Sequence, residues 1–181
     1  MTREFEPLGG ETVHEAAIFT VRRERFRFAD GAEVDRDIVR HDGAVAIVAL
    51  DGDEVVLVLQ PREAVGDPDS LELPAGRLDK EGEAPEATGE RELEEECGLA
   101  AGRWEHLTTY RSSAGFTDEV VHLYLAQDLT PVADPADSGE DERIEVVRRP
   151  LAELDALIDE VTDAKTLIGL LLLQRRLRRR D

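Results

Sequence analysis

Apolar and polar residues alternate along the first part of the chain. The alternation runs from Val13 to Phe28 and resumes from Val34 to Val39, with Asp30-Gly31 between them. Alternation with a period of two is typical of half-exposed strands, and Asp-Gly is a strong hairpin signal. We expect residues 1–40 to form a small antiparallel sheet that packs on the rest of the chain or on a second subunit, because so small a sheet is not stable alone.

Two continuous apolar runs follow, at Ala44–Leu50 and Val55–Leu59, joined around Asp51-Gly52. Continuous rather than alternating apolar character predicts strands that are buried on both faces. Three further segments have the composition of strands: Trp104 to Tyr110, Val120 to Ala126 and Ile144 to Val147.

The first helix is predicted between Ala84 and Cys97. Proline at 85 is tolerated in a first helical turn, and Gly98 is typical of the position after a helix. Leu151 to Ile158 also has helical spacing, and Asp163 is a candidate N-cap for a last helix running to about Leu177. In that helix four apolar residues are expected to close one side of the sheet: Leu167, Ile168, Leu171 and Leu172. This order of elements predicts a mixed sheet covered on both sides.

The first predicted helix carries a dense acidic run, from Glu90 to Glu96, with Arg91 as its single cation. At about 100° per residue, Glu92, Glu95 and Glu96 share one face. An isolated run of this kind is usually a solvated helix face. Three convergent carboxylates also suit Mg²⁺ or Mn²⁺, since hard cations prefer oxygen ligands and leave room for waters and substrate phosphates.

The composition is strongly acidic, with a formal charge of −20 and only two lysines, Lys80 and Lys165. Such a surface repels nucleic acid and anionic membranes. A high-salt cytoplasm and a GC-rich genome would both explain it. One cysteine, Cys97, excludes an internal disulfide and fits a small packed residue in a reducing compartment. The polar N-terminus lacks a signal-peptide core, and no apolar run approaches the roughly 20 residues of a membrane span, so we expect a soluble cytoplasmic protein.

The acidic run belongs to a longer ordered pattern. Its members are Gly76, Glu83, Arg91, Glu92, Leu93, Glu95, Glu96, Gly98 and Leu99. This pattern resembles the Nudix box, a glycine-to-glutamate loop followed by Arg-Glu-apolar-x-Glu-Glu-x-Gly-apolar. The helical half matches without a gap, whereas six residues separate Gly76 from Glu83 where the family usually has five. We predict that the extra residue makes a bulge in the loop and leaves the carboxylate face intact.

The resemblance implies a fold and a chemistry. It implies an α/β fold, a Nudix-like α/β/α sandwich with a mixed sheet over residues 41–181, preceded by the small antiparallel sheet of residues 1–40 as a dimerisation element. It implies phosphoanhydride hydrolysis with Mg²⁺, or Mn²⁺, held by Glu92, Glu95 and Glu96 and by the carbonyl of Ala75. Arg91, between acidic neighbours, suits a role in orienting carboxylates.

Weaker matches extend along most of the chain and resemble the ADP-ribose pyrophosphatases within this family. They include the segments RDIVRHDGAVAIV, QPR, LELPAG, SSAGFTDE and DAKTLIGLLL. This resemblance implies a catalytic glutamate in the loop before Ile144. We expect Glu140 to be the base and Glu142 a further metal ligand, or the reverse. It also makes Arg36 and Arg62 candidate phosphate or adenine contacts, and Glu119 a candidate contact to the distal ribose.

The expected activity is hydrolysis of ADP-ribose to AMP and ribose 5-phosphate by a homodimer. One alternative is another nucleoside-diphosphate sugar or a dinucleoside polyphosphate as substrate. A second is a non-catalytic nucleotide sensor. The arginine-rich end, RRLRRR, is expected to be solvated charge that complements the dipole of the last helix, rather than a nucleic acid or partner contact.

Overall fold

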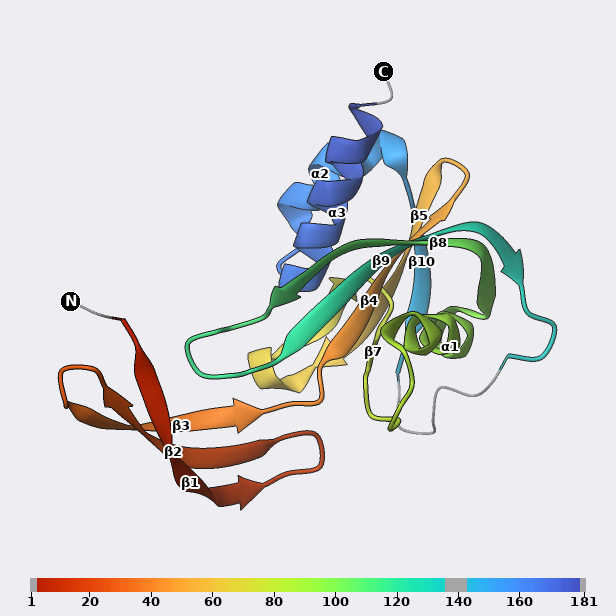
Figure 1. The fold of residues 1–181 in the computed structure, drawn as a ribbon. Helices are drawn as coiled ribbons and strands as arrows, with labels where there is room; N and C mark the ends of the chain where they lie inside the picture. Colours follow the sequence, from red (N-terminus) through yellow and green to blue (C-terminus); the bar gives the residue numbers. More distant parts are fainter. Residues whose placement is uncertain (1–2, 136–142, 180–181) are drawn as a thin grey trace. The chain divides into compact units, whose positions relative to one another are not determined.

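The computed structural model describes residues 3–135 and 143–179. The chain divides into two compact units, Met1–Gly43 with Tyr110–Val120, and Ala44–Thr109 with Val121–Asp181. Figure 1 shows the elements of each. No helix in the described ranges is long and apolar enough to cross a membrane.

The first unit contains an antiparallel sheet with the order β1 (Phe5–Glu15), β2 (Thr20–Phe28) and β3 (Glu33–Arg40). The hairpin at Asp30-Gly31 is as expected, with Gly31 N–H donating to Phe28 O at 2.9 Å. Arginines and acids pair across this sheet, for example Arg25 with Asp35 at 2.7 Å.

The single strand expected from Val13 to Phe28 is two strands. Their junction is a turn in which Ala16 N–H donates to Phe19 O at 2.9 Å. It contains no Gly, Pro, Asn or Asp, so turn chemistry does not reveal it. β1 was missed because its side chains are exposed on both faces, which leaves no apolar alternation to detect.

The second unit contains the larger sheet, which has seven strands within the described residues. Its main path runs β10 (Glu145–Pro150), β5 (Glu54–Arg62), β4 (Ala44–Asp51), β9 (Val120–Pro131) and β8 (Leu99–Arg111); β6 (Asp67–Glu72) pairs with β5, and β7 (Ala75–Arg77) pairs with β4. β4 runs parallel to β9 and antiparallel to β5 and β7, so the sheet is mixed as expected.

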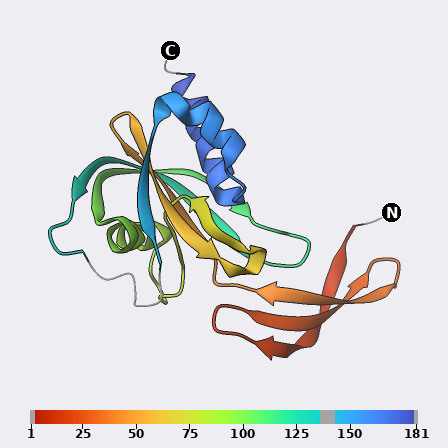
Figure 2. The same cartoon turned by 180° about the vertical axis from the view of Figure 1, so that it is seen from behind.

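Helices cover both faces of this sheet (Figures 1 and 2). On β4, Ile47 and Ala49 belong to the same buried cluster as Leu93 of α1 (Pro85–Cys97). The intervening Val48 lies against Gly169 of α3 (Ala164–Leu177). Because successive side chains of a strand point to opposite faces, α1 and α3 cover opposite sides, which confirms the α/β/α arrangement.

The C-terminal helices differ from expectation in detail. The segment Leu151–Ile158 begins as a short 3₁₀ turn, Leu151–Glu153, and continues as α2 (Leu154–Glu160). Helix α3 has the predicted bounds, and the Asp163 side chain accepts from Thr166 N–H. The face expected to be buried is wrong: the buried residues are Thr166, Gly169, Leu170 and Leu173, and Leu171 is 44% exposed. With apolar residues at seven of the first ten positions, the pattern does not define one stripe.

Candidate active site

Helix α1 begins and ends as the sequence predicts. Ala84 is its extended N-cap, Pro85 its first residue, and Gly98 ends it in the left-handed conformation with φ of 64°. The Gly98 N–H donates to Glu94 O at 2.8 Å. Leu93 is fully buried on the sheet, which turns the acidic residues of the helix toward β7 and the loop that follows it.

Glu92 and Glu96 both reach the short strand β7. The Ala75 N–H donates to Glu96 Oε2 at 3.0 Å. The Glu92 side chain lies so close to Gly76 that a Cβ added at this glycine would overlap its carboxylate. The two carboxylates therefore converge on consecutive residues of one strand, and a side chain at the second of them would displace the Glu92 carboxylate.

Arg91 is the cation at the centre of the acidic cluster. Its Nη1 lies 2.7 Å from both Glu92 Oε1 and Glu95 Oε2. Its Nη2 lies 3.6 Å from Glu83 Oε2 and 3.9 Å from Asp79 Oδ1. Burial acts to lower the pKa of Arg91, but Glu92 and Glu95 outweigh it and the pKa is raised. One guanidinium thus faces four carboxylates and fixes the orientation of two.

The loop before α1 also brings Glu83 into this cluster. A turn closes where Glu83 N–H donates to Lys80 O at 3.1 Å, with Gly82 at φ of 79°. The Glu83 carboxylate then accepts from Thr88 Oγ1 at 2.8 Å. The loop that contains the extra residue therefore still places the Glu83 carboxylate beside α1.

The donor chemistry of this cluster fits a hard divalent cation. Glu92, Glu95 and Glu96 supply carboxylate oxygens, and the adjoining β7 backbone supplies a carbonyl at Ala75. In the part of the chain that the structure describes, no three acidic, histidine or cysteine side chains surround a common point as in a formed metal site. Glu95 and Glu92 instead share Arg91, and Glu96 holds the Ala75 amide.

Comparison with known proteins agrees with this geometry. The model of the NUDIX domain family matches residues 39–176, a span that holds the whole cluster. The chain belongs to this family. It is a Nudix hydrolase, and enzymes of the family generally use divalent metal ions.

Two relatives are similar over almost the full length. One, an ADP-ribose pyrophosphatase of Mycobacterium tuberculosis, is 40% identical over 93% of this chain and 82% of the relative. Another, an ADP-ribose pyrophosphatase of Bacillus subtilis, is 36% identical over 94% and 93%. A crystal structure of an ADP compounds hydrolase shares the fold, with a TM-score of 0.87, 24% identity, and coverage of 99% of this chain and 97% of that one.

A second charged network of this Nudix hydrolase surrounds Glu72, which is 1% exposed at the end of β6. Both Arg62 Nε and Nη2 donate to its two oxygens at 2.7 Å. Lys165 of α3 also pairs with Glu72 and lies 3.1 Å from Asp163. Burial of Glu72 acts to raise its pKa, but the pairs with Arg62 and Lys165 outweigh it and lower the pKa from 4.5 to about 2.

Two other predicted site residues do not belong to the unit that contains α1. Arg36 and Glu119 belong to the first unit. Arg36 Nη1 donates to Asp35 O at 2.9 Å, and Glu119 Oε1 lies 3.7 Å from His41 Nδ1. Glu140 and Glu142 lie outside the described residues.

Sequence reasoning missed Asp79, Thr88, Glu72 and Lys165. Glu72 carried a signal, since it is an acid between two leucines, and Lys165 is one of only two lysines. Neither signal predicts that Glu72 and Lys165 pair with each other, because these two residues are 93 positions apart in the sequence. Cys97 packs beside the Leu93 cluster, where burial raises the pKa of its thiol to about 12, as fits a packed residue rather than a nucleophile.

Proposed function

We propose that this Nudix hydrolase cleaves the pyrophosphate bond of ADP-ribose to give AMP and ribose 5-phosphate. The observation that carries the proposal is the convergence of Glu92 and Glu96 on Ala75-Gly76, with Glu95 beside them on α1. The choice of ADP-ribose is supported by the two relatives at 40% and 36% identity, both ADP-ribose pyrophosphatases.

The proposed metal ligands are Glu92, Glu95, Glu96 and the carbonyl of Ala75, with Mg²⁺ as the ion and Mn²⁺ as a substitute. When bound, a divalent ion neutralises pyrophosphate charge and lowers the pKa of a bound water. The chain's own part is to present the carboxylates: Leu93 anchors α1 on the sheet, and Arg91 orients Glu92 and Glu95 through its 2.7 Å contacts. A residue that holds ligands in this way limits the misplacement that slows catalysis.

The proposed base is Glu140, with Glu142 as a further metal ligand, or with these roles exchanged. Glu95 is a catalytic candidate as well, because it lies within the carboxylate cluster. Both glutamates come shortly before β10 in the sequence. Either carboxylate can serve as the base that takes the proton of the attacking water.

Arg62 is the proposed contact to a substrate phosphate. Glu72 binds the Nε and Nη2 edge of its guanidinium, so the Nη1 edge remains available while the side chain is held in place. The Arg62 side chain is 43% exposed although its partner is buried. A planar, always charged fork fixed on one edge suits bidentate recognition of phosphate by the other.

Arg36 is the proposed contact to adenine. Within the first unit it lines an open cavity of about 380 Å³ together with Phe5, Phe26, Phe28 and Phe116, which supply aromatic surface. Cavities of this size accommodate small ligands, and guanidinium groups stack on flat rings. Glu119, in the same unit, is the proposed contact to the distal ribose, since a carboxylate accepts hydrogen bonds from hydroxyls.

We also propose a homodimer formed through residues 1–40. Large apolar side chains are exposed on this segment, including Phe5, Leu8, Val13 and Ile18. These exposed apolar groups offer a surface that a second copy of the chain would cover. Light scattering after size exclusion at assay concentration should give twice the mass of one chain, and a monomer there would contradict this part of the proposal.

A substrate panel tests the proposed activity. The protein is incubated with Mg²⁺ and ADP-ribose, other nucleoside-diphosphate sugars and dinucleoside polyphosphates, and the products are separated. AMP should be released fastest from ADP-ribose, and water labelled with ¹⁸O shows which product gains the oxygen. Equal rates across the panel would reject the specific substrate, and no hydrolysis of any compound would favour a nucleotide sensor.

A further inference from the structure

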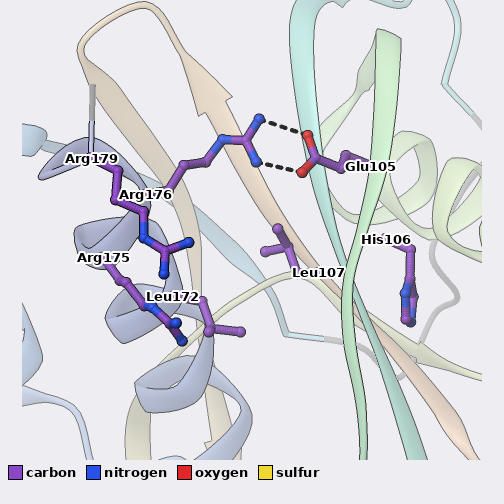
Figure 3. Close-up of a pocket in the computed structure, with 7 residues that line it drawn as sticks. All are labelled: Glu105, His106, Leu107, Leu172, Arg175, Arg176 and Arg179. Carbon is purple, nitrogen blue, oxygen red and sulfur yellow. Dashed lines mark hydrogen bonds and ion pairs between the residues drawn. The ribbon is translucent and has the colours of Figure 1, made fainter.

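The arginine-rich end of the chain is not uniformly solvated. Arg175, Arg176 and Arg179 line a cavity of about 390 Å³ between the end of α3 and strand β8 (Figure 3). Arg178 instead lies 3.6 Å from Asp155. A complement to the helix dipole requires cations near the end of α3, but it does not require three of them to share a cavity.

This cavity carries an excess of positive charge. Arg176 is neutralised by a two-point ion pair with Glu105 of β8. Within the described residues, no acid pairs with Arg175 or Arg179. Figure 3 shows these two side chains extending toward Leu172, on the α3 side of the cavity. Arg175 is in the last turn of α3 and Arg179 follows its C-cap, so two like charges line one cavity and an anion between them would relieve their repulsion.

The size and charge of the cavity favour a small phosphate compound. Three arginines against Glu105 leave two positive charges, with histidine neutral. A phosphate monoester carries about −1.5 to −2 at pH 7, and guanidinium groups bind phosphate oxygens in pairs. Leu107 and Leu172 offer apolar contact to the organic part. A nucleic acid is disfavoured, because the chain as a whole carries −20 and repels an extended polyanion.

The cavity is separate from the acidic cluster. It includes α3, which covers the face of the large sheet opposite α1, because Val48 packs on α3 whereas Ile47 and Ala49 pack with α1. Strand β8 contributes Glu105, His106 and Leu107 to it. Trp104, from the other face of that strand, lies beside Gly89 of α1.

We propose that the cavity formed by Arg175, Arg176, Arg179 and Glu105 binds the phosphate group of a small phosphate monoester, at a site distinct from the one that hydrolyses substrate. The proposal does not depend on which pyrophosphate the enzyme cleaves. Two sources of this chemistry are a sugar or nucleoside monophosphate and free inorganic phosphate.

Isothermal titration of the full chain, without divalent metal and at low salt, tests the site with three probes: AMP, ribose 5-phosphate and inorganic phosphate. The R175Q/R179Q variant should bind the preferred probe at least about tenfold more weakly, since two of the charges that hold it are lost. The matched control, R103Q/R178Q, removes two exposed arginines outside the cavity and should bind within about twofold of the original chain.

The three probes separate the sources. Tighter binding of AMP or ribose 5-phosphate than of phosphate supports recognition of the ester, and equal binding supports recognition of the phosphate group alone. If both variants lost affinity to the same extent, the effect would come from net charge alone and the proposal would be wrong. Unchanged binding in R175Q/R179Q, or no binding of any probe to the original chain, would also overturn the proposal. Failure of ADP-ribose hydrolysis would reject the proposed function and leave this result intact.

Discussion

Two groups of glutamates in the larger unit have opposite charge balance. Glu72 is almost fully buried and forms ion pairs with two cations, Arg62 and Lys165. On α1, Glu92 and Glu95 share the single guanidinium of Arg91, which also faces Glu83. The first group is neutralised within the protein, whereas the second has an excess of negative charge that an external cation would balance.

The number of cations around a glutamate therefore distinguishes two roles, a support for a neighbouring side chain and a candidate metal ligand. A carboxylate with enough cations around it, such as Glu72, becomes a fixed support for a neighbouring guanidinium. A group of carboxylates that shares one cation, such as Glu92 and Glu95 with Arg91, is a candidate set of ligands for a bound metal ion. Counting cations around each acid therefore separates a positioning group from a candidate ligand more clearly than burial or sequence position does.

The largest effect is expected from Glu96→Gln. Loss of one ligand charge should lower the rate of ADP-ribose hydrolysis by about 10²–10⁴-fold, since metal stabilisation of the reacting phosphates contributes several kcal/mol. Steady-state kinetics with saturating Mg²⁺ measure it. Glu90→Gln, an exposed acid on the same helix, should change the rate less than about twofold. Equal rates of hydrolysis in Glu96→Gln and the original enzyme would contradict the role of the α1 carboxylates as metal ligands.

Glu72→Gln should mainly affect stability. A pKa that falls from 4.5 in the unfolded chain to about 2 in the folded one corresponds to about 3 kcal/mol. The variant also leaves Arg62 and Lys165 with reduced compensation. Denaturant unfolding at pH 7 should show a loss of about this size, together with a higher KM for ADP-ribose because Arg62 is less fixed. A loss below about 0.5 kcal/mol would mean that the pairs of Glu72 with Arg62 and Lys165 contribute little net stability, as when the desolvation of a buried charge offsets its attraction to its partners.

The same carboxylate predicts a pH dependence. Its folded pKa is depressed, so its contribution to stability is complete above about pH 4.5 and is lost as the pH falls toward about 2. The difference in unfolding free energy between the original chain and Glu72→Gln should therefore shrink across this range. A difference that stays constant from pH 6 to pH 2 would contradict the assigned pKa.

Gly76→Ala should disturb the acidic group without removing a charge. The added methyl group would overlap the Glu92 carboxylate and displace it, which should reduce hydrolysis by between about ten- and a hundredfold. Gly102→Ala is the control, because Gly102 lies on β8 and its added Cβ would come no closer than 3.3 Å to another atom. If Gly76→Ala is fully active with an unchanged dependence on Mg²⁺, Glu92 is not held against β7 in the working enzyme.

The smallest effect concerns Cys97. Burial raises the pKa of its thiol to about 12, so almost none is thiolate at pH 7 to 8. Native protein should react with a thiol reagent far more slowly than unfolded protein, and Cys97→Ser should retain activity within about threefold. Rapid labelling of the native chain would show that this side of α1 opens to solvent.

Signals from neighbouring residues in the sequence predicted most of the helices and strands and the acidic face of α1. Pro85, Gly98 and Asp163 fixed helix ends correctly because capping depends on neighbouring residues alone. The resemblance to the Nudix box identified the family, and the spacing within that pattern predicted the acids on one helical face. The chain-distant features were not predictable in this way: the pairing of Glu72 with Lys165, the buried face of α3 and the exposed strand β1 all depend on tertiary contacts.

The most direct test of the charge comparison is a titration with Mn²⁺ followed by electron paramagnetic resonance. The original chain should bind Mn²⁺ at a site that is lost in E92Q/E96Q and kept in Glu72→Gln, because the α1 acids share one guanidinium whereas Glu72 is paired with both Arg62 and Lys165. Equal Mn²⁺ binding by the original chain and E92Q/E96Q would contradict the account, and it would place the metal elsewhere in the molecule.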